Sequence, residues 1–502
     1  MQMIHRFGSG ESEEYFGHYL ALLKEYPKEG NTVWFASHYG FPPLEKHEKE
    51  SARLVEIAGK FRENHIGVSL QISNTLGHGE YMSSQDCTGL VYDGSPAENM
   101  VAPDGTKANY CFCWNGKHFR DYTKKAVTAY AALHPDCIWF DDDLRPNNHA
   151  PVPFGCFCSD CIASFNQKYS SAKPFTREKL VEEFLYGDLK VRENWINFVR
   201  EGLYSFTYEI CSEVHEALPD CEFGYQYCAN GAYTGRGFDY ILNAMKAANG
   251  KDPLTRPGGG AYSDHNPGEF LSKASFLSRA NALLPPYVKC KCPEIENLPF
   301  EAYEKSPAGC AFECAYYMAG GATDMSFSMM MHENERREYY EETLRLLSAN
   351  DKYKYRRRLA AENARTVAAG MRFFISDFSW RRKLNKAAGE DFYAMNSEYW
   401  WGANYWIRDG LPLTFEAAEK DVILLHPETA KPISREEYEK LLGGYVLAVR
   451  NPRGEKFTLM RQGTDEEIAI SAEKTLTAGG NEEYVLKLPS VPAYTVCTVF
   501  ID

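Results

Sequence analysis

Across the first 350 residues, short apolar runs alternate with longer amphipathic stretches, and this alternation limits the folds open to the chain. Apolar runs of this length suit buried parallel strands, and the stretches between them suit covering helices. The strand candidates are residues 32–40, 66–73, 109–114, 137–143, 222–231, 254–260, 287–297 and 322–331. Eight strands alternating with helices predict an α/β fold, the (β/α)8 or TIM barrel. An open doubly wound sheet is the alternative, but its glycine-rich dinucleotide turn does not follow the first strand.

The pattern changes after residue 350. Strand-like runs and helical stretches alternate again on a smaller scale, which predicts a small α/β domain over residues 351–444. Apolar alternation without helical stretches follows, and it predicts a short C-terminal β domain over residues 445–502. The expected organisation is therefore a large catalytic barrel over residues 1–350 and two small domains behind it.

Charge and composition restrict the partners. The formal net charge of -14 argues against a nucleic-acid partner, which would favour clustered lysine and arginine. The N-terminus lacks the basic-then-apolar pattern of a signal peptide, and no stretch has the length of a membrane span. The 15 cysteines are odd in number and spread along the chain, which fits reduced thiols. We therefore expect a cytoplasmic protein that binds neither nucleic acid nor membrane.

Carboxyl groups follow two of the predicted strands. Residues 141–143 are three consecutive aspartates at the end of the predicted fourth strand, and Glu294 and Glu296 end the seventh. Barrel enzymes carry their reacting groups at these strand ends, so the two sets would face each other across the barrel mouth. Glycoside hydrolysis needs two such carboxyl groups, one as acid and one as nucleophile or base. Alternatively, the acids pair with Arg145 or Arg256, or bind a cation.

Polar side chains at the ends of other predicted strands are candidates for hydrogen bonds to a sugar. They are His38 after the first strand, Asn74 and His78 after the second, Tyr225 and Asn230 at the fifth, and His332 and Glu333 after the eighth. Each of them could instead cap the backbone of its own loop.

A cysteine cluster follows the three aspartates. Cys156, Cys158 and Cys161 form the motif C-x-C-x-x-C. Such a dense set of thiols is typical of a tetrahedral zinc site that takes a fourth ligand from elsewhere. The alternative is a set of buried, reduced thiols that pack as small apolar residues.

The segment "DDDLRPNNHAPVPFGCFCSDCIASFNQKY" resembles a part of glycoside hydrolase family 42. In that family the fourth strand ends in Asp-Asn-Glu and a cysteine cluster follows. The resemblance places the family's acid/base glutamate at Asp143 and its asparagine at Asp142. The family's zinc also takes an earlier cysteine, best matched in "YCFCWNGKHFR" by Cys113, with Cys111 as the alternative. The implied ligands of a structural zinc are Cys113, Cys156, Cys158 and Cys161.

The resemblance continues, more weakly, into the C-terminal part. "DVILLHPETAKPISREEYEKLL" is similar to the family's flavodoxin-like trimerisation domain, and "LPSVPAYTVCTVFID" is similar to its closing β domain. This implies a homo-oligomer, specifically a trimer. The chain departs from the family by an aspartate at position 143 and by "EIENLP" where the family has Glu-Gln-Gln-Pro. These departures resemble the family 164 β-mannosidases, which share the architecture.

Together the residues and the resemblance predict a retaining glycoside hydrolase that cleaves a β-linked sugar, as β-galactosidases and β-mannosidases do. Asp143 is expected to protonate the leaving oxygen, and Glu294 or Glu296 to form the glycosyl-enzyme intermediate. Two other functions remain open: a carbohydrate-binding barrel without activity, and a metal-dependent hydrolase that uses residues 141–143.

Overall fold

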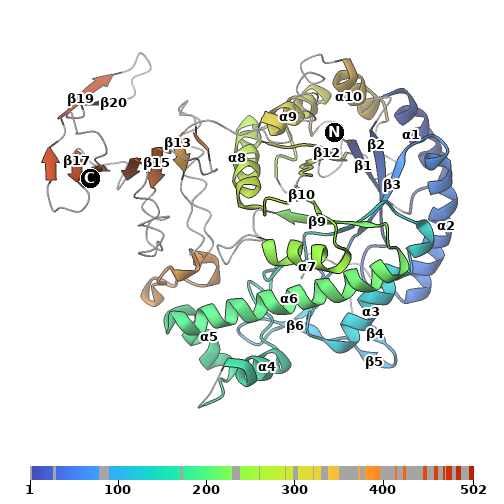
Figure 1. Ribbon diagram of the computed structural model, residues 1–502, viewed down its shortest axis with the longest axis horizontal. Coiled ribbons are helices and arrows are strands. Elements are labelled where there is room, and N and C mark those ends of the chain that lie inside the picture. Colours follow the sequence, from blue (N-terminus) through green and yellow to red (C-terminus); the bar gives the residue numbers. More distant parts are fainter. Residues whose placement is uncertain are drawn as a thin grey trace. The chain divides into compact units, whose positions relative to one another are not determined.

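The computed structural model describes most of the first 349 residues and parts of the rest. The described residues are 3–8, 10–26, 30–78, 90–169, 173–228, 238–258, 260–288, 290–297, 304–319, 321–329, 337–349, 371–373, 379–395 and the strands given below beyond residue 412. The chain divides into two compact units (Figure 1). Unit 1 holds residues 1–233, 237–366 and 383–394, and unit 2 holds residues 234–236, 367–382 and 395–502.

Unit 1 contains an eight-stranded parallel sheet with helices around it (Figure 1). The strands lie in the order β10-β9-β8-β3-β2-β1-β12-β11. A parallel bridge between Thr255 and Lys291 links the two ends of this order, so the sheet is nearly closed. The predicted (β/α)8 barrel is therefore confirmed. Its strands are β1 (Met3–Gly8), β2 (Asn31–Ala36), β3 (Gly67–Ile72), β8 (Cys137–Phe140), β9 (Glu222–Cys228), β10 (Leu254–Gly258), β11 (Glu294–Glu296) and β12 (Met325–Ser328).

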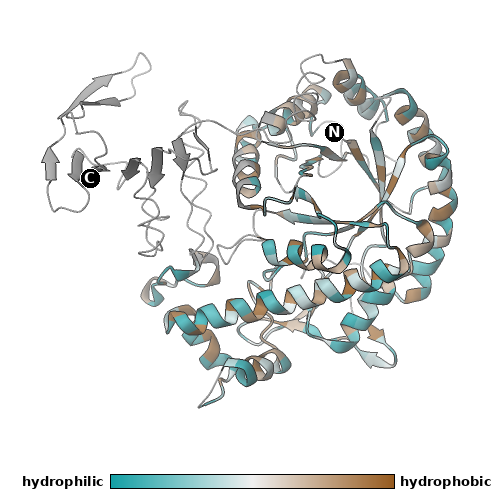
Figure 2. Ribbon diagram, viewed as in Figure 1, coloured by the Kyte–Doolittle hydropathy of each residue, from teal (hydrophilic) through white to brown (hydrophobic). Residues whose placement is uncertain are grey.

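The helices of unit 1 cover the sheet with their apolar sides. In α1, for example, the buried residues Tyr15, Tyr19 and Leu22 recur at helical spacing, and Ser12 caps the first turn by accepting from the Tyr15 N–H. Figure 2 shows this mixture of hydrophobic and hydrophilic residues on each helix. The helices are α1 (Glu13–Glu25), α2 (Leu44–Arg62), α3 (Lys117–Thr128), α4 (Ser159–Tyr169), α5 (Arg177–Tyr186), α6 (Leu189–Ala217), α7 (Asp239–Asn249), α8 (Pro267–Leu283), α9 (Pro307–Ala319) and α10 (Arg337–Ala349).

The N-terminal segment forms a barrel strand that the sequence pattern did not reveal. β1 contains His5 and Arg6, which look unsuited to a barrel core, but His5 bonds Asn31 and Arg6 bonds Glu294. The predicted third strand at 109–114 was wrong, because it forms β7 (Lys107–Phe112), which pairs antiparallel with β6 (Asn99–Val101) outside the barrel. The two errors cancel. The aspartates therefore still follow the fourth barrel strand, and the two glutamates lie on the seventh.

A layer of large side chains fills the barrel below its mouth. Ile4, Trp34, Cys137, Trp139 and Cys292 form one buried cluster. The ring centroids of Trp34 and Trp139 lie 4.9 Å apart. The barrel interior is therefore packed, and polar chemistry is restricted to the level above these rings.

Unit 2 is described mainly through its strands. β13 (Met371–Phe373), β14 (Leu413–Thr414), β15 (Val422–Leu425) and β16 (Tyr445–Ala448) form a parallel sheet in the order β14-β13-β15-β16. The remaining strands pair antiparallel: β17 (Phe457–Arg461) with β18 (Glu467–Ala469) and β21 (Cys497–Ile501), and β19 (Ser471–Leu476) with β20 (Glu482–Lys487). The predicted limits of three domains stay a prediction.

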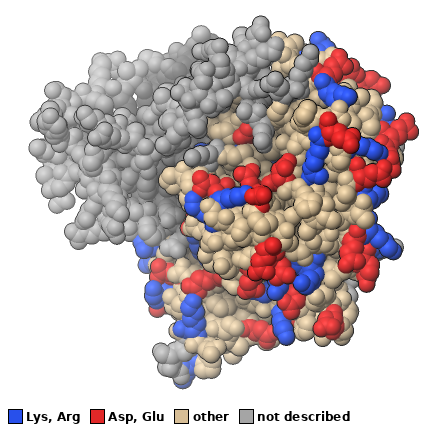
Figure 3. Space-filling model, turned by 45° about the vertical axis from the view of Figure 1, so that its right-hand side comes forward, with Lys and Arg blue, Asp and Glu red and all other residues tan. Residues whose placement is uncertain are grey.

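Two further features concern possible partners. None of the helices in the described residues combines the length and the apolar character that a membrane crossing requires. On the face drawn in Figure 3, acidic and basic side chains are interspersed over the described surface. A phosphate backbone would instead favour a uniformly basic area.

Candidate active site

Arg256 joins the carboxyl groups of the fourth and seventh strands. It extends from β10, and its guanidinium nitrogens lie 2.6 Å from Glu294 Oε2 and 3.9 Å from Asp141 Oδ1. Arg6, from β1, donates to the other oxygen of Glu294 at 3.2 Å. Acidic residues that are far apart in the chain therefore meet over the centre of the barrel.

The pKa values of the two glutamates of β11 are shifted in opposite directions. Burial raises the pKa of Glu294, but the charges of Arg256 and Arg6 outweigh this and leave that pKa lowered. Burial and the neighbouring charge of Glu294 raise the pKa of Glu296 to about 7. Glu296 is only partly buried and accepts one hydrogen bond of 3.4 Å from Ser328. At neutral pH, Glu294 is therefore ionised, and Glu296 is protonated in about half of the molecules.

Asp141 and Asp142 lie beside cationic groups. Asp141 accepts from Gln71 at 3.3 Å and from His78 at 3.0 Å. Burial lowers the pKa of His78, but its hydrogen bond to Asp141 and the nearby aspartates raise that pKa to about 9. Asp142 pairs with Arg145 at 3.4 Å, and 24% of its side chain is exposed. Burial raises the pKa of Asp142, but Arg145, His78 and Arg256 outweigh this and hold it at about 2.

Asp143 has a different environment from its two neighbours. It is fully buried, and its Oδ2 accepts the backbone N–H groups of Thr75, Leu76 and Gly77 at 2.8, 2.9 and 2.5 Å. Burial raises its pKa to about 6. Its Oδ1 is also buried and has no hydrogen-bond partner among the described residues. Asp143 thus holds the loop after β3 against the exit of β8, and neither of its oxygens is accessible to a substrate in this conformation.

Gly77 is required at the point where Asp143 holds the loop. Its φ is +99°, and a Cβ atom there would collide with the backbone oxygen of Tyr110. Its carbonyl oxygen accepts from Asn148 Nδ2 at 2.5 Å and from the Cys111 thiol at 3.4 Å. Three segments of chain therefore converge on this one residue.

Three of the predicted substrate ligands bond to the protein backbone. Asn74 Oδ1 accepts from the Gly40 N–H at 2.5 Å, and the Tyr225 hydroxyl donates to Leu144 O at 2.9 Å. The His38 ring bonds the Tyr39 carbonyl at 2.9 Å. These contacts match the alternative in which the side chains cap loops. The predicted residues Asn230, His332 and Glu333 lie outside the described residues.

Gln226 and Arg6, which had no predicted role, also line the mouth beside Arg256. Gln226 on β9 is in register with Arg256 on β10, so the two side chains share the inner face of the sheet. Gln226 is fully buried, yet neither of its amide atoms has a hydrogen-bond partner among the described residues, and the same holds for the Nε atoms of Arg6 and Arg256. Buried polar atoms are normally bonded, so unpaired atoms beside a charged mouth suit a polar ligand. For Gln226, the inward parity of β9 was the signal available in the sequence.

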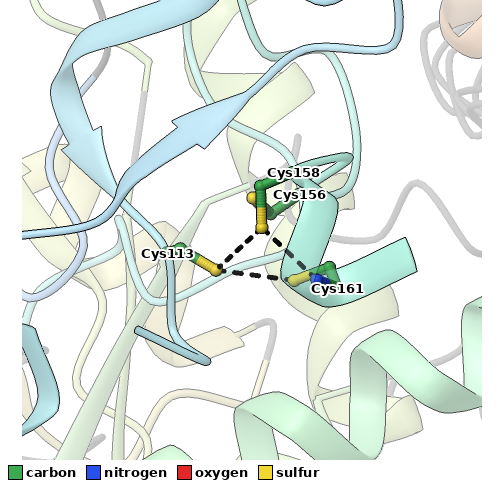
Figure 4. A group of neighbouring side chains, drawn as sticks. All are labelled: Cys113, Cys156, Cys158 and Cys161. Atoms are coloured by element: carbon green, nitrogen blue, oxygen red, sulfur yellow. Dashed lines mark hydrogen bonds between the residues drawn. The ribbon is translucent and has the colours of Figure 1, made fainter. Parts of the chain in front are cut away.

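Four cysteine sulfurs converge beside the mouth (Figure 4). Cys113 follows β7, Cys156 and Cys158 lie in the loop after β8, and Cys161 is in the first turn of α4. All four sulfurs lie within 4.8 Å of one another, and Cys113 Sγ is 3.5 Å from Cys161 Sγ and 4.0 Å from Cys158 Sγ. Ligands at about 2.3 Å from a tetrahedral zinc lie about 3.8 Å from each other, so the four thiols fit this ion.

N–H groups of the surrounding chain point at the sulfurs of the cysteine cluster. Backbone or amide N–H groups of Asn115, Val101 and Cys161 donate to three of the sulfurs at 3.3 to 3.4 Å. Cys111 bonds Gly77 instead, so the geometry selects Cys113 as the fourth member of the cluster.

A second group of possible metal ligands lies in the mouth. The ligand atoms of His78, Asp141 and Asp142 also come within 4.8 Å of one another. Arg145 and Arg256 already neutralise the two aspartates, however, and the raised pKa of His78 keeps its ring protonated. In this arrangement the three residues form an ion-pair network, and a divalent cation would have to displace the His78 proton and both arginines.

Comparisons with solved structures identify similar folds. A β-galactosidase from the psychrophilic Marinomonas ef1 has a TM-score of 0.57 and 10% identity over 100% of this chain and 88% of that chain. A β-galactosidase from Bacillus circulans sp. alkalophilus has a TM-score of 0.58 and 12% identity, and the match covers 100% of this chain and 86% of that chain. A catalytic mutant of a family 42 β-galactosidase from G. stearothermophilus has a TM-score of 0.58 and 11% identity, and the match covers 99% of this chain and 85% of that chain.

The sequence itself matches no protein-family model and no curated protein. Identities of 10 to 12% demonstrate a shared fold and leave the chemistry to be argued from the residues. The predicted resemblance is confirmed at this level: the chain has the barrel fold of the family 42 β-galactosidases.

Proposed function

We propose that the protein is a glycoside hydrolase that cleaves a β-linked sugar at the mouth of its barrel. The observation that carries this proposal is that Arg256 contacts both Asp141, after β8, and Glu294, on β11, so the acidic residues of these two segments meet at the mouth. The unpaired polar atoms of Gln226, Arg6 and Arg256 support it, because a sugar offers hydroxyl groups that both donate and accept.

The reacting pair is assigned to Asp142 and Glu296. Both are partly exposed, whereas Asp141 and Glu294 are buried among cationic groups and Asp143 is bound by backbone N–H groups. Asp142 also pairs with Arg145, but at 3.4 Å and with 24% of its side chain exposed. The pKa values of Asp142 and Glu296 are also pushed apart, to about 2 and about 7. Such a separation divides two carboxyl groups into an ionised group and a proton donor.

In this assignment, Glu296 protonates the leaving oxygen while the Asp142 carboxylate attacks the anomeric carbon. The bond from that carbon to the leaving oxygen breaks, and an ester to Asp142 forms. The Glu296 carboxylate then takes a proton from water, which attacks the same carbon, releases Asp142 and restores the original configuration. These roles replace the acid/base role that the resemblance implied for Asp143.

The substrate class is a β-galactoside or a β-mannoside. The galactoside follows from the resemblance to family 42 and from the names of the structural neighbours, and the mannoside from the resemblance to family 164. A structural zinc at Cys113, Cys156, Cys158 and Cys161 completes the proposal. Four thiolates would leave it no open position, so it would stabilise the loop after β8 and take no part in the reaction. A trimer and a cytoplasmic location remain predictions from the sequence.

A panel of aryl β-glycosides tests the function, and azide tests the roles. We expect turnover that is lost in both Asp142→Asn and Glu296→Gln. Azide should restore product from both variants, with a glycosyl azide of inverted configuration from Asp142→Asn and one of retained configuration from Glu296→Gln. The opposite configurations would exchange the two roles. Binding without turnover by the wild type would instead favour a carbohydrate-binding barrel, and turnover only with added divalent cation would favour a metal-dependent hydrolase.

A further inference from the structure

A buried charge network lies behind β11, on the side away from the barrel centre. Glu313 on α9 accepts from Lys273 on α8 at 3.3 Å and from Lys305 at 2.7 Å. The hydroxyl of Tyr317 adds a third bond to Glu313, at 2.5 Å. Lys273, Lys305 and Glu313 are at most 3% exposed. Burial of three charges is costly, and apolar residues of similar size would stabilise a fold as well, so the network is of little use as a stabilising device alone.

Each lysine of this network also binds the main chain of one mouth glutamate. Lys273 Nζ donates to the backbone oxygen of Glu294, and Lys305 Nζ to the backbone oxygen of Glu296, both at 2.5 Å. With Gly260 O at 3.1 Å and Glu313, Lys273 has three acceptors, which match the three N–H groups of an ammonium. Burial lowers the pKa of Lys273 by more than Glu313 raises it, but the three acceptors around its Nζ favour the ammonium form. Burial also lowers the pKa of Lys305, but there Glu313 outweighs the effect and raises it.

The network carries an unbalanced charge. Two ammonium groups face one carboxylate, which leaves one positive charge behind β11. Among the described residues, the charged or titratable groups around Glu296 are Arg6 from β1, Arg256 from β10, Glu294 from β11, Lys273 from α8, Lys305, and Tyr262 from the loop before α8.

We infer that Lys273, Lys305 and Glu313 are positioning residues for the reaction. They fix the main chain of β11 at both glutamates and place one net positive charge behind Glu296. The inference deepens the proposed function and depends on Glu296 as the proton donor. Because the donor must be protonated, activity is lost as pH rises through the pKa of Glu296, and any charge behind β11 moves this basic limit.

The basic limit is the pH at which kcat falls on the alkaline side. Substitutions that add or remove a positive charge behind β11 should move this limit in opposite directions. Glu313→Gln keeps the shape of the side chain but raises the excess to two positive charges, which lowers the pKa of Glu296 and moves the limit to lower pH. Lys273→Met removes the excess and moves it to higher pH. A change of one unit charge in a protein interior, close to the Glu296 carboxyl group, should shift the pKa of Glu296 by about one pH unit in either direction.

The double variant Glu313→Gln/Lys305→Met removes one charge of each sign. Its basic limit should return to within about 0.3 pH units of the wild type, while kcat stays reduced because the Glu296 carbonyl has lost its donor. The matched control is Arg192→Met, since Arg192 is another buried cation that donates to two backbone carbonyls, those of Phe184 and Leu185, at the end of α5. The control should lower the melting temperature and leave the limit unchanged.

A direct titration separates this inference from the proposed function. In carbon-13-labelled protein, the NMR signal of the Glu296 carboxyl carbon is the one that disappears in Glu296→Gln. Following this signal with pH gives the pKa of Glu296 whether or not a substrate is turned over. Opposite shifts in Glu313→Gln and Lys273→Met support the inference even if no glycoside is cleaved. Shifts in the same direction, or none in folded variants, overturn it even if the enzyme is an active glycosidase.

Discussion

Arg256 and Glu294 form a buried ion pair with a nitrogen–oxygen distance of 2.6 Å, and their side chains are 4% and 5% exposed. Removal of one partner from such a pair leaves an uncompensated charge in a region that water does not reach. This cost normally exceeds the net stabilisation that the intact pair provides.

Arg256→Met should therefore lower the free energy of unfolding at pH 7 by about 3–5 kcal/mol, measured by urea denaturation. Arg256→Met/Glu294→Gln should recover part of this loss, because it removes the unpaired charge as well. The lowered pKa of Glu294 means that its stabilising contribution is present above the ordinary glutamate value near 4.5 and is lost as pH falls below it. A single variant as stable as the wild type would show that the pair is not formed.

Glu296→Gln should lower activity strongly and increase stability at alkaline pH. Its raised pKa means that the folded protein holds a proton that the unfolded chain releases, so stability falls as pH rises from 4.5 through about 7. The amide does not ionise, so at pH 8 the variant should be more stable by up to about 3 kcal/mol, with little difference at pH 4. Loss of a general acid should lower kcat by about 10²- to 10⁴-fold, and least for substrates with good leaving groups. Equal stability of both proteins at pH 8 would contradict the raised pKa.

Asp143→Ala and Asp142→Asn should have different effects. Asp143→Ala leaves the N–H groups of Thr75, Leu76 and Gly77 without their acceptor, so we expect a stability loss of about 2–5 kcal/mol. Asp142→Asn should remove turnover with a smaller loss of stability, because Arg145 loses its carboxylate partner but keeps its bond to the Asn147 carbonyl. Thermal unfolding with parallel activity assays compares the two. A stable, inactive Asp143→Ala would return the acid/base role to Asp143.

Cys113→Ser and Cys111→Ser test the metal site as a matched pair. We expect about one zinc per chain in the wild type and in Cys111→Ser, and little in Cys113→Ser, measured by elemental analysis. Because binding of a structural zinc contributes to folding, loss of the metal should lower the melting temperature by several degrees. A wild type without zinc, or equal zinc in both variants, would exclude the site.

The sequence predicted the barrel and the two sets of carboxyl groups, because alternating apolar runs and strand-end acids are local patterns. It did not reveal β1, since His5 and Arg6 become acceptable in a core only through Asn31 and Glu294, which are distant in the chain. Nor did it separate Asp142 from Asp143. Side chains alternate between inward and outward positions only within a strand, and β8 ends at Phe140, before the aspartates. The conformation of the loop after β8 therefore decides which aspartate contacts the backbone of the loop after β3.

The convergence of three chain segments on Gly77 limits how this protein can be re-engineered. Any new side chain at that position would separate Asp143, Asn148 and Tyr110, so even alanine there should disturb the whole rim. Libraries aimed at a new sugar preference should leave Gly77 unchanged. They should vary mouth residues whose side chains make no hydrogen bond to the described backbone, and Gln226 is the first choice.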